Sequence, residues 1–235
     1  MRHLPPIDKY IQLSNIELPD VTKRPNDVTN FVTKQCKNVT LEVGKFLGSG
    51  GFGSVFEGHC MGRKVALKRI RNNQKNPHAV AESYTAEKVA MTLQHRNIVR
   101  VIGTTEAQTC VEHLRTERLI LMEYAGSRNL LSIINDETEV ITTCRRLKFA
   151  SDIANALCYI HKQNVAHLDV KPANIIVSFR DQCKLGDFGC CKVVPEGGEA
   201  SPTTPTNSYL TGTLAYRSPE LLKGGFIEFS CTFIG

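Results

Sequence analysis

The pattern of hydrophobic and polar residues changes near residue 41. Residues 1–40 are mostly polar, contain four prolines and show no sustained hydrophobic period, which is typical of a flexible leader. From Leu41 to Leu47 apolar and polar residues roughly alternate, and this period of two predicts a half-buried strand. We therefore expect a flexible leader over residues 1–40 and a folded domain over residues 41–235.

Short apolar runs beyond this point predict further strands, and longer periodic segments predict helices. Apolar residues recur at roughly helical spacing over residues 78–94 and, most clearly, over residues 145–163. A shorter helix is expected over residues 129–135. The residues that recur in the clearest helix are Leu147, Ala150, Ile153, Ala154, Leu157 and Ile160. The expected strands are Val55–Gly58, Val65–Lys68, Ile98–Gly103 and Leu119–Tyr124.

The apolar run 121–126 passes from an expected strand into a glycine-containing connection. Such a connection suits a hinge between two lobes, because most predicted strands precede it and the clearest helix follows it. We therefore place an N-lobe at residues 41–122, the hinge at residues 123–126 and a C-lobe at residues 127–224.

Composition and charge narrow the class of protein. The 235 residues are 41% hydrophobic, which suits a folded core. The net charge of +6 comes from scattered residues, so we expect a solvated surface and no nucleic-acid partner. The first residues lack the apolar core of a signal peptide, and no apolar run approaches the roughly 20 residues that span a bilayer. These features predict a cytoplasmic protein with no membrane partner.

The nine cysteines do not indicate a metal or redox site. Their spacing is irregular and no Cys-x-x-Cys pair occurs, so neither a zinc site nor a redox pair is predicted. In a cytosolic protein we expect them to be small buried hydrophobic residues.

A glycine-rich segment follows the first expected strand. Gly48, Gly50 and Gly53 allow a tight turn and let backbone N–H groups approach phosphate oxygens. This spacing alone also fits a dinucleotide-binding fold. However, the next segment predicts a strand rather than a helix, and Lys68 follows in a further apolar strand. Because no Gly-Lys-Ser/Thr follows either, the order argues against both a dinucleotide fold and a P-loop.

The most informative stretch is His167–Asn174. It places Asp169 two residues before Lys171 and five before Asn174, and Asp187 comes thirteen residues after Asn174. A phosphoryl-transfer site needs a carboxylate to receive the substrate hydroxyl and a cation to meet the moving phosphate. It also needs oxygen ligands for magnesium, which an amide and a second carboxylate supply. The stretch therefore predicts a phosphoryl-transfer site.

Taken together, these motifs resemble the eukaryotic protein kinase family. The resemblance runs from about Leu41 to Gly224, and several motifs in the right order are far more specific than any one of them. It implies an α+β, two-lobed protein-kinase fold, with a small β-rich N-lobe and a mainly helical C-lobe. The motifs that carry it are Leu47–Val55, Val65–Lys68, His167–Asn174, Asp187–Cys190 and Pro219–Gly224.

Carried over by position, the resemblance implies ATP and Mg²⁺ as cofactors and a role for each motif residue. Asp169 accepts the proton of the substrate hydroxyl, and Lys171 steadies the γ-phosphate. Asn174 and Asp187 hold magnesium. The residues assigned to ATP binding are Leu47, Gly48, Ser49, Gly50, Gly51, Phe52 and Gly53 in the lid, Val55, Ala66 and Ile176 around the adenine, Lys68 with its partner Glu87, and Met122, Glu123 and Ala125 at the hinge. Glu82 competes with Glu87 as the partner of Lys68, but it lies close to the expected start of the helix.

Two residues indicate which members of the protein kinase family the sequence resembles. A lysine at position 171 resembles the serine/threonine-specific members of the family rather than the tyrosine kinases. Leu168 stands at a position where an arginine is commoner. The resemblance then implies a monomeric serine/threonine kinase that activates the MAP kinase cascade, with a MAP kinase kinase as its protein substrate. In many kinases the arginine pairs with a phosphate on the activation segment. We hypothesise that activity here does not depend on such a phosphate.

The end of the chain departs from the family pattern. The family places an aspartate in a helix that follows the Pro219–Glu220 motif, but no aspartate occurs after Asp187 and Thr232 stands about where it would fall. Residues 225–235 look unrelated to a kinase. We therefore expect an incomplete C-lobe, and the alternative function is a non-catalytic product that binds only ATP or a partner.

Overall fold

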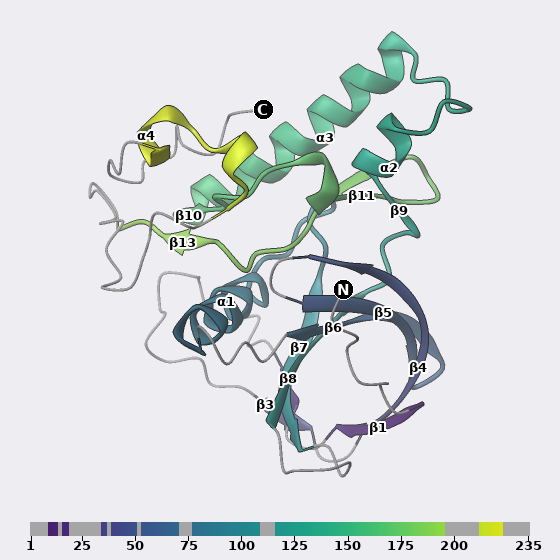
Figure 1. Cartoon of the computed structure of the whole chain (residues 1–235), viewed down its shortest axis with the longest axis vertical. Helices are drawn as coiled ribbons and strands as arrows, with labels where there is room; N and C mark the ends of the chain where they lie inside the picture. The colour runs from purple at the N-terminus through teal and green to yellow at the C-terminus, as the bar shows by residue number, and fades with distance from the viewer. Residues whose placement is uncertain are drawn as a thin grey trace.

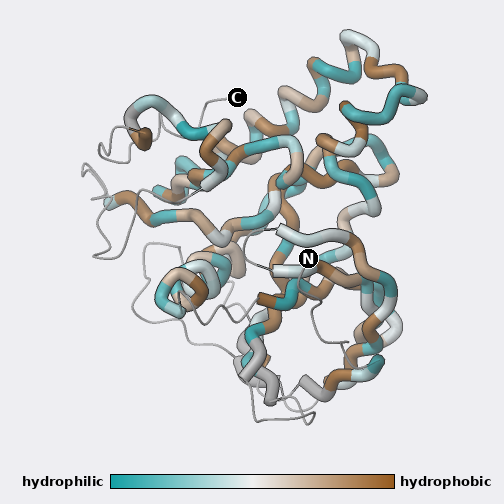
Figure 2. The backbone as a smooth tube through the Cα atoms, viewed as in Figure 1, coloured by the Kyte–Doolittle hydropathy of each residue, from teal (hydrophilic) through white to brown (hydrophobic). Residues whose placement is uncertain are grey.

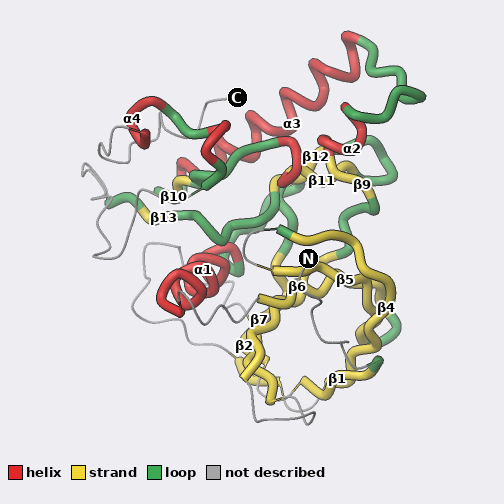
Figure 3. The backbone as a smooth tube through the Cα atoms, viewed as in Figure 1, coloured by secondary structure: helices red, strands yellow, loops and turns green. Residues whose placement is uncertain are grey.

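The computed structural model describes residues 9–13, 16–18, 34–36, 39–50, 53–70, 77–108, 116–195 and 212–222. The expected tail over residues 225–235, most of the leader, and the lid residues Gly51 and Phe52 lie outside this part of the chain. Within it, the large sheet forms one lobe, and most helices lie in the other together with short strands (Figure 3). No helix in the described residues is long and apolar enough to cross a membrane.

The N-lobe is built on one eight-stranded antiparallel sheet with the order β1-β4-β5-β6-β8-β7-β2-β3. The sheet curls on itself, so that β1 comes close to β7 although four strands lie between them in the order (Figure 1). Its strands are β1 (Tyr10–Leu13), β2 (Ile16–Leu18), β3 (Lys34–Cys36), β4 (Val39–Ser49), β5 (Gly53–Cys60), β6 (Arg63–Ile70), β7 (Val101–Gln108) and β8 (Thr116–Glu123).

The expectation of a flexible leader over residues 1–40 is corrected by β1, β2 and β3. Tyr10 pairs with Glu42, and the side chains of Ile11 and Ile16 are buried in the same cluster as Leu41. These strands are three or four residues long, which is too short for a period of two to stand out in the sequence. These strands form because they pair with β4 and β7, which would otherwise leave unpaired backbone groups at the edges of the sheet. Their apolar side chains also cover the apolar face of the sheet.

Side-chain alternation divides the core of the N-lobe into two clusters. Leu67 and Leu121 belong to the cluster that includes β1 and β4, whereas Ala66, Ile120 and Met122 belong to the main cluster that includes helix α1 (Pro77–Ala90). Every side chain from Val65 to Ile70 is buried, because β6 is covered on both faces. Figure 2 shows the resulting mixture of hydrophobic and hydrophilic residues along the strands.

Helix α1 lies against the sheet and turns Glu87 inward. The predicted helix over residues 78–94 is confirmed, but it ends at Ala90, and Met91 and Leu93 follow in a buried turn. The next residues tie this turn to the C-lobe: the Asn97 side chain donates to the Cys183 carbonyl at 2.9 Å, and the Val99 N–H donates to the Leu185 carbonyl at 2.8 Å.

The C-lobe contains short strands around helix α3 (Thr143–Lys162), whose first turn is capped by Thr142. The predicted helices over 129–135 and 145–163 are confirmed, but Leu147 and Ala150 are exposed, because α3 buries a face centred on Phe149, Leu157 and Ile160 instead. The other elements are β9 (Arg128–Asn129), α2 (Leu130–Ile134), β10 (Val165–Ala166), η1 (Pro172–Asn174), β11 (Ile175–Val177), β12 (Cys183–Leu185), β13 (Lys192–Val193), η3 (Leu214–Tyr216) and α4 (Pro219–Leu222).

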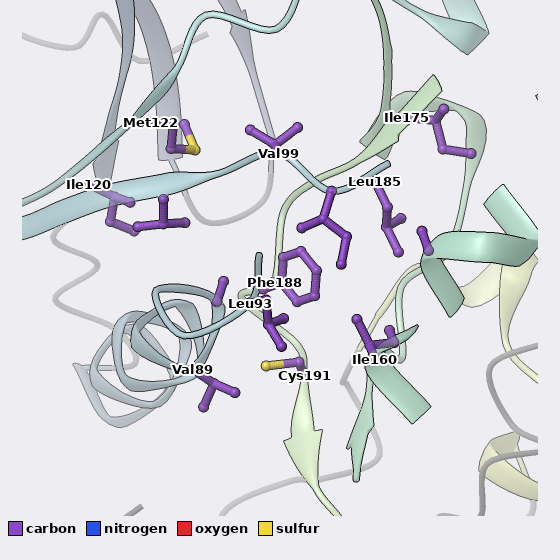
Figure 4. Packing of buried hydrophobic residues seen from close by; sticks show 14 of the residues in the cluster. Val89, Leu93, Val99, Ile120, Met122, Ile160, Ile175, Leu185, Phe188 and Cys191 are labelled. Atoms are coloured by element: carbon purple, nitrogen blue, oxygen red, sulfur yellow. The ribbon is translucent and has the colours of Figure 1, made fainter. Parts of the chain in front are cut away.

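Phe188 joins the two lobes at the centre of the main cluster. It is 1% exposed and lies between Leu93 on the α1 side and Leu185 and Ile160 on the C-lobe side (Figure 4). Because its neighbours Asp187 and Gly189 are fixed by this burial, the packing of one aromatic ring positions the functional turn.

Candidate active site

A hairpin brings the two residues predicted to hold magnesium together. Strands β11 and β12 pair antiparallel with Ile175 opposite Leu185, so Asn174 and Gly186 meet at one end of the hairpin. The Gly186 N–H donates to the Asn174 carbonyl at 2.9 Å, and Asp187 follows directly. Asp187 has a φ of +59°, in the left-handed region, which turns the chain sharply between Gly186 and the buried ring of Phe188.

Lys68 is the cation of the site and bridges two carboxylates. Its Nζ donates to Glu87 Oε1 and, at 2.6 Å, to Asp187 Oδ1. Lys68 is 5% exposed and Glu87 is 1% exposed, so both charges are removed from water. The predicted pairing of Lys68 with Glu87 is thus confirmed, whereas Glu82 is exposed on the other side of α1. This network joins β6, α1 and the Asp187 turn.

The pKa values of the three groups reflect competition between burial and pairing. Burial acts to lower the pKa of the Lys68 ammonium, but the charges of Asp187 and Glu87 outweigh it and the pKa is raised. Burial raises the pKa of Glu87, and Lys68 offsets part of this effect. Burial also acts to raise the pKa of Asp187, but the charge and hydrogen bond of Lys68 prevail and set it at about 2. Asp187 is therefore ionised at neutral pH.

This depressed pKa predicts a loss of stability in acid. Because the folded-state pKa of Asp187 is about 2 and its ordinary value is 3.8, its stabilising effect is complete above about pH 4 and is lost as the pH falls towards 2. The contribution is roughly 2 kcal/mol. We expect the difference in unfolding free energy between wild type and Asp187→Asn, measured in urea, to shrink over this range. A difference that stays constant from pH 5 to pH 2 would contradict the assignment.

Asp169 is held in place by three donors. The Thr213 N–H donates to Oδ1 at 2.8 Å, while Lys171 Nζ and Asn174 Nδ2 donate to Oδ2 at 2.7 and 2.9 Å. Lys171 Nζ also contacts Thr213 Oγ1 at 2.5 Å. The carboxylate is 6% exposed and its direction is fixed, as a group that must receive a proton at one place requires.

His167 supports this loop from beneath. It is fully buried, and its ring packs edge-on against Phe188 with centroids 4.8 Å apart. Burial lowers the pKa of His167, so the ring is neutral. Its Nδ1 accepts from the Asp169 N–H at 3.3 Å, which leaves the proton on Nε2 to be donated to the Gly186 carbonyl at 3.0 Å. One imidazole therefore links the Asp169 loop to the Asp187 turn.

These residues face a cleft of about 270 Å³ between the lobes. It is lined by most of the residues predicted for ATP and metal binding: Leu47, Gly48, Ser49, Gly50, Val55, Ala66, Lys68, Met122, Glu123, Ala125, Lys171, Asn174, Ile176 and Asp187. Glu87 lies behind Lys68, and Gly53 and Asp169 do not line the cleft wall; Gly51 and Phe52 are not described. The cleft is also lined by seven residues to which no ATP or metal role was assigned from the sequence, although Gly126 was placed in the hinge and Ala173 in the motif 167–174: Val99, Gly126, Ser127, Arg128, Asn129, Ala173 and Gly186.

The glycines of the lid differ in what they make room for. A Cβ at Gly53 would lie 2.3 Å from the Arg69 carbonyl oxygen of the paired strand, so this glycine is required by strand packing. A Cβ at Gly48 would contact nothing within 4 Å, and one at Gly50 would lie 3.9 Å from Asp187 Oδ2. Gly50 thus faces Asp187 Oδ2 across the cleft.

The hinge passes close to the C-lobe at Gly126. A Cβ there would lie 2.3 Å from the Val177 carbonyl oxygen, so only glycine allows the hinge to approach β11 this closely. On the other side, Glu123 accepts through Oε1 from the Arg100 N–H at 2.9 Å and from Lys184 Nζ at 2.8 Å. The glycine that ends the apolar run 121–126 was the signal in the sequence that could have identified Gly126 as part of the site.

The donor set fits a magnesium ion together with phosphate oxygens. Asn174 Nδ2 is committed to Asp169, which leaves its amide oxygen for a cation, and Asp187 Oδ1 is committed to Lys68, which leaves Oδ2. Among the described residues no group of three or more His, Cys, Asp or Glu could hold a metal ion. Mg²⁺ is commonly bound by one or two protein oxygens and completed by substrate phosphates, which matches this pair.

Comparison with known proteins identifies the family. The model of the protein kinase domain family matches residues 41–230. Similar proteins named serine/threonine-protein kinase mos occur in Patiria pectinifera, 50% identical over 179 residues, in Xenopus laevis, 38% identical over 181 residues, and in Ciconia nigra, 37% identical over 194 residues. Each alignment covers 76% of this chain, and covers 49%, 50% and 94% of the relative, respectively.

The chain thus spans about half the length of the first two relatives and nearly all of the third. The family match confirms the fold class expected from the sequence, a two-lobed fold with a β-rich N-lobe. Because that match extends over 190 of the 235 residues, the chain belongs to the protein kinase family, with serine/threonine kinases named mos among its relatives.

Proposed function

We propose that this chain transfers the γ-phosphoryl group of ATP to serine or threonine side chains of a protein, with Mg²⁺ as the metal. The observation that carries the proposal is the convergence of Lys68, Asp187 and Asn174 on one cleft, with Asp169 held behind its wall by a hydrogen bond from Asn174. The relatives named serine/threonine-protein kinase mos support the class of acceptor.

Each side chain contributes a separate part of the chemistry. Lys68 is a buried, permanently charged donor that faces the region where the α- and β-phosphates bind in kinases. Asp169 is oriented by three donors to receive the proton of the attacking hydroxyl. Lys171 adds positive charge beside it. Magnesium, when bound by Asn174 and Asp187, supplies further positive charge to the phosphates. Positioning and fixed charge do most of the work in such a reaction.

We propose a MAP kinase kinase as the substrate, and activation of the MAP kinase cascade as the outcome, because the sequence resembles kinases that act there. The test is transfer from radiolabelled ATP to a catalytically inactive MAP kinase kinase, compared with a general substrate such as casein. Phosphoserine or phosphothreonine on the MAP kinase kinase alone supports the proposal. Equal labelling of both proteins would retain the kinase activity and reject the substrate. The cytoplasmic, monomeric state stays a prediction.

Leu168 carries a further prediction about regulation. It is 5% exposed, has a φ of +63° and packs with Ala166, Cys190, Val194 and Leu221. This apolar cluster, against which Leu221 packs, therefore connects the catalytic loop to the segment 212–222, at a position where many kinases use an arginine and a phosphate. We expect phosphatase treatment to leave the activity within about twofold of the untreated protein. Thr204 and Thr211 lie between Asp187 and Pro219, in the segment that carries an activating phosphate in many kinases. Loss of activity on phosphatase treatment, with recovery in Thr204→Glu or Thr211→Glu, would contradict this prediction.

A further inference from the structure

Phe179 and Tyr124 form an exposed aromatic pair beside the hinge. Phe179 lies in the turn between β11 and β12 and is 81% exposed, and its ring stacks on that of Tyr124 with centroids 6.5 Å apart. Glu123 and Ala125 line the cleft, whereas Tyr124 between them is not part of the cleft wall. The proposed phosphoryl transfer uses neither ring, and large aromatic side chains are enriched where a protein surface binds a partner.

Positively charged side chains surround this aromatic pair. Lys64 of β6 places its Nζ 4.0 Å from the centroid of the Tyr124 ring, which is a cation–π contact. Arg180 is exposed in the turn between β11 and β12. The backbone of Arg100, whose side chain is also exposed, pairs with Glu123, the residue before Tyr124. We call these residues the hinge surface: Lys64, Arg100, Tyr124, Phe179 and Arg180.

The acidic residues beside the hinge surface are themselves bound by cations. These pairs are Glu57 with Lys45 and Lys64, Glu123 with Lys184, and Asp181 with Arg145 and Lys148. In the part of the chain that the structure describes, no carboxylate forms an ion pair with Arg100 or Arg180. The hinge surface therefore carries an excess of positive charge around two aromatic rings, and its charge is complementary to an acidic partner.

We propose that the hinge surface docks an acidic segment of the protein substrate, and that one large apolar side chain of this segment covers Phe179. The inference rests on the proposed function, because it requires a protein acceptor. The cations attract the acidic residues of the segment, and the two rings bury its apolar side chain. Docking at this second place raises the effective concentration of the acceptor hydroxyl near Asp169 without a further contact in the cleft.

The position of the hinge surface favours a substrate over a segment that blocks the nucleotide site. The surface adjoins the hinge, yet none of its residues lines the cleft. An occupant therefore leaves the nucleotide site open, so docking and phosphoryl transfer can occur together.

The test compares Phe179→Ala and Arg180→Ala with Leu147→Ala and Arg146→Ala in the full 235-residue chain. Leu147 and Arg146 are exposed on α3, so the two controls remove an apolar side chain and a positive charge from another part of the C-lobe. Because all four side chains are exposed, each variant should melt close to the wild-type temperature.

The first measurement is direct binding of the fluorescein-labelled peptide Glu-Asp-Asp-Phe-Glu-Glu by anisotropy, which needs no catalytic turnover. We expect Phe179→Ala to weaken the Kd of the peptide roughly tenfold, because an aromatic anchor is lost. Arg180→Ala should weaken it about threefold and reduce its dependence on salt. The two controls should bind as the wild type does. An equal Kd in wild type and Phe179→Ala, or no binding to the wild type, would overturn the inference alone.

The second measurement is phosphoryl transfer to the catalytically inactive MAP kinase kinase. We expect Phe179→Ala to raise the KM for this protein roughly tenfold, with kcat and the KM for ATP within about twofold of the wild type. An unchanged KM for the protein beside weakened peptide binding would overturn the inference, because the occupant would then be a partner other than the substrate. No transfer by the wild type, with peptide binding intact, would overturn the proposed function and with it the docking of a substrate.

Discussion

Replacement of Asp187 by asparagine is expected to lower kcat roughly a thousandfold while the protein stays folded. The charge that a bound magnesium supplies to the transition state is worth several kcal/mol, and each 1.36 kcal/mol is a factor of ten in rate. Asparagine keeps an oxygen for Lys68 but removes the negative charge that anchors the metal. The stability lost at neutral pH is about 2 kcal/mol, which is less than the 5–15 kcal/mol of a typical domain.

The matched control for this variant is Asp181→Asn. Asp181 lies in the turn between β11 and β12 and pairs with Arg145, which leaves it outside the residues that line the cleft. Removal of a negative charge at position 181 should leave the rate of phosphoryl transfer within about twofold of the wild-type rate, although the ion pair with Arg145 is lost. Measured kcat near the wild-type value in Asp187→Asn, with melting unchanged, would show that Asp187 does not bind the metal.

Replacement of Lys68 by methionine should abolish activity and also destabilise the chain. The substitution leaves Glu87 and Asp187 as two carboxylates without their shared cation, and one of them is almost fully buried. Removal of one partner of a buried pair typically costs about 3–5 kcal/mol. We therefore expect a clear drop in the urea midpoint together with loss of nucleotide binding. In contrast, Lys68→Arg keeps the charge and should lose phosphorylation without unfolding.

A double substitution separates the two effects of Lys68. In Lys68→Met combined with Glu87→Leu the uncompensated carboxylate is gone, so most of the lost stability should return while activity remains absent. Lys148→Met is the control, because that lysine is half exposed on α3 and its loss should change stability by less than about 0.5 kcal/mol. If Lys68→Met melted at the same temperature as the wild type, the buried ion pair would contribute nothing to the stability of the fold.

The parts of the site that the sequence predicts are those set by short-range geometry. Period-two alternation identifies β4, a short apolar run identifies β6, and helical spacing turns Glu87 rather than Glu82 towards the sheet. The assignment of Asn174 and Asp187 to one magnesium came from the motif spacing and the family resemblance, and the hairpin of β11 and β12 places both residues at one of its ends. These features depend on residues that are close in sequence or share a face, so patterns and motif spacing are sufficient to find them.

Other features depend on contacts that no local pattern encodes. Val99 lines the cleft because its N–H pairs with Leu185, 86 residues later, and Ile11 is buried because β1 adds to the edge of the sheet. Leu147 fitted the period of α3 yet is exposed, since an apolar period fixes the helix but not which face meets the rest of the lobe. Ser83 lies against the Asp187 turn only because residue 189 is glycine, and no local pattern predicts this contact.

The most direct test of the account is phosphoryl transfer by the purified 235-residue chain with radiolabelled ATP, with and without Mg²⁺, beside the variant Asp169→Asn. We expect Mg²⁺-dependent label on serine and threonine of the acceptor protein, which falls to background in the variant. This expectation would be contradicted by the absence of label in the wild type while Mg-ATP still raises its melting temperature, because the chain would then bind nucleotide without catalysis.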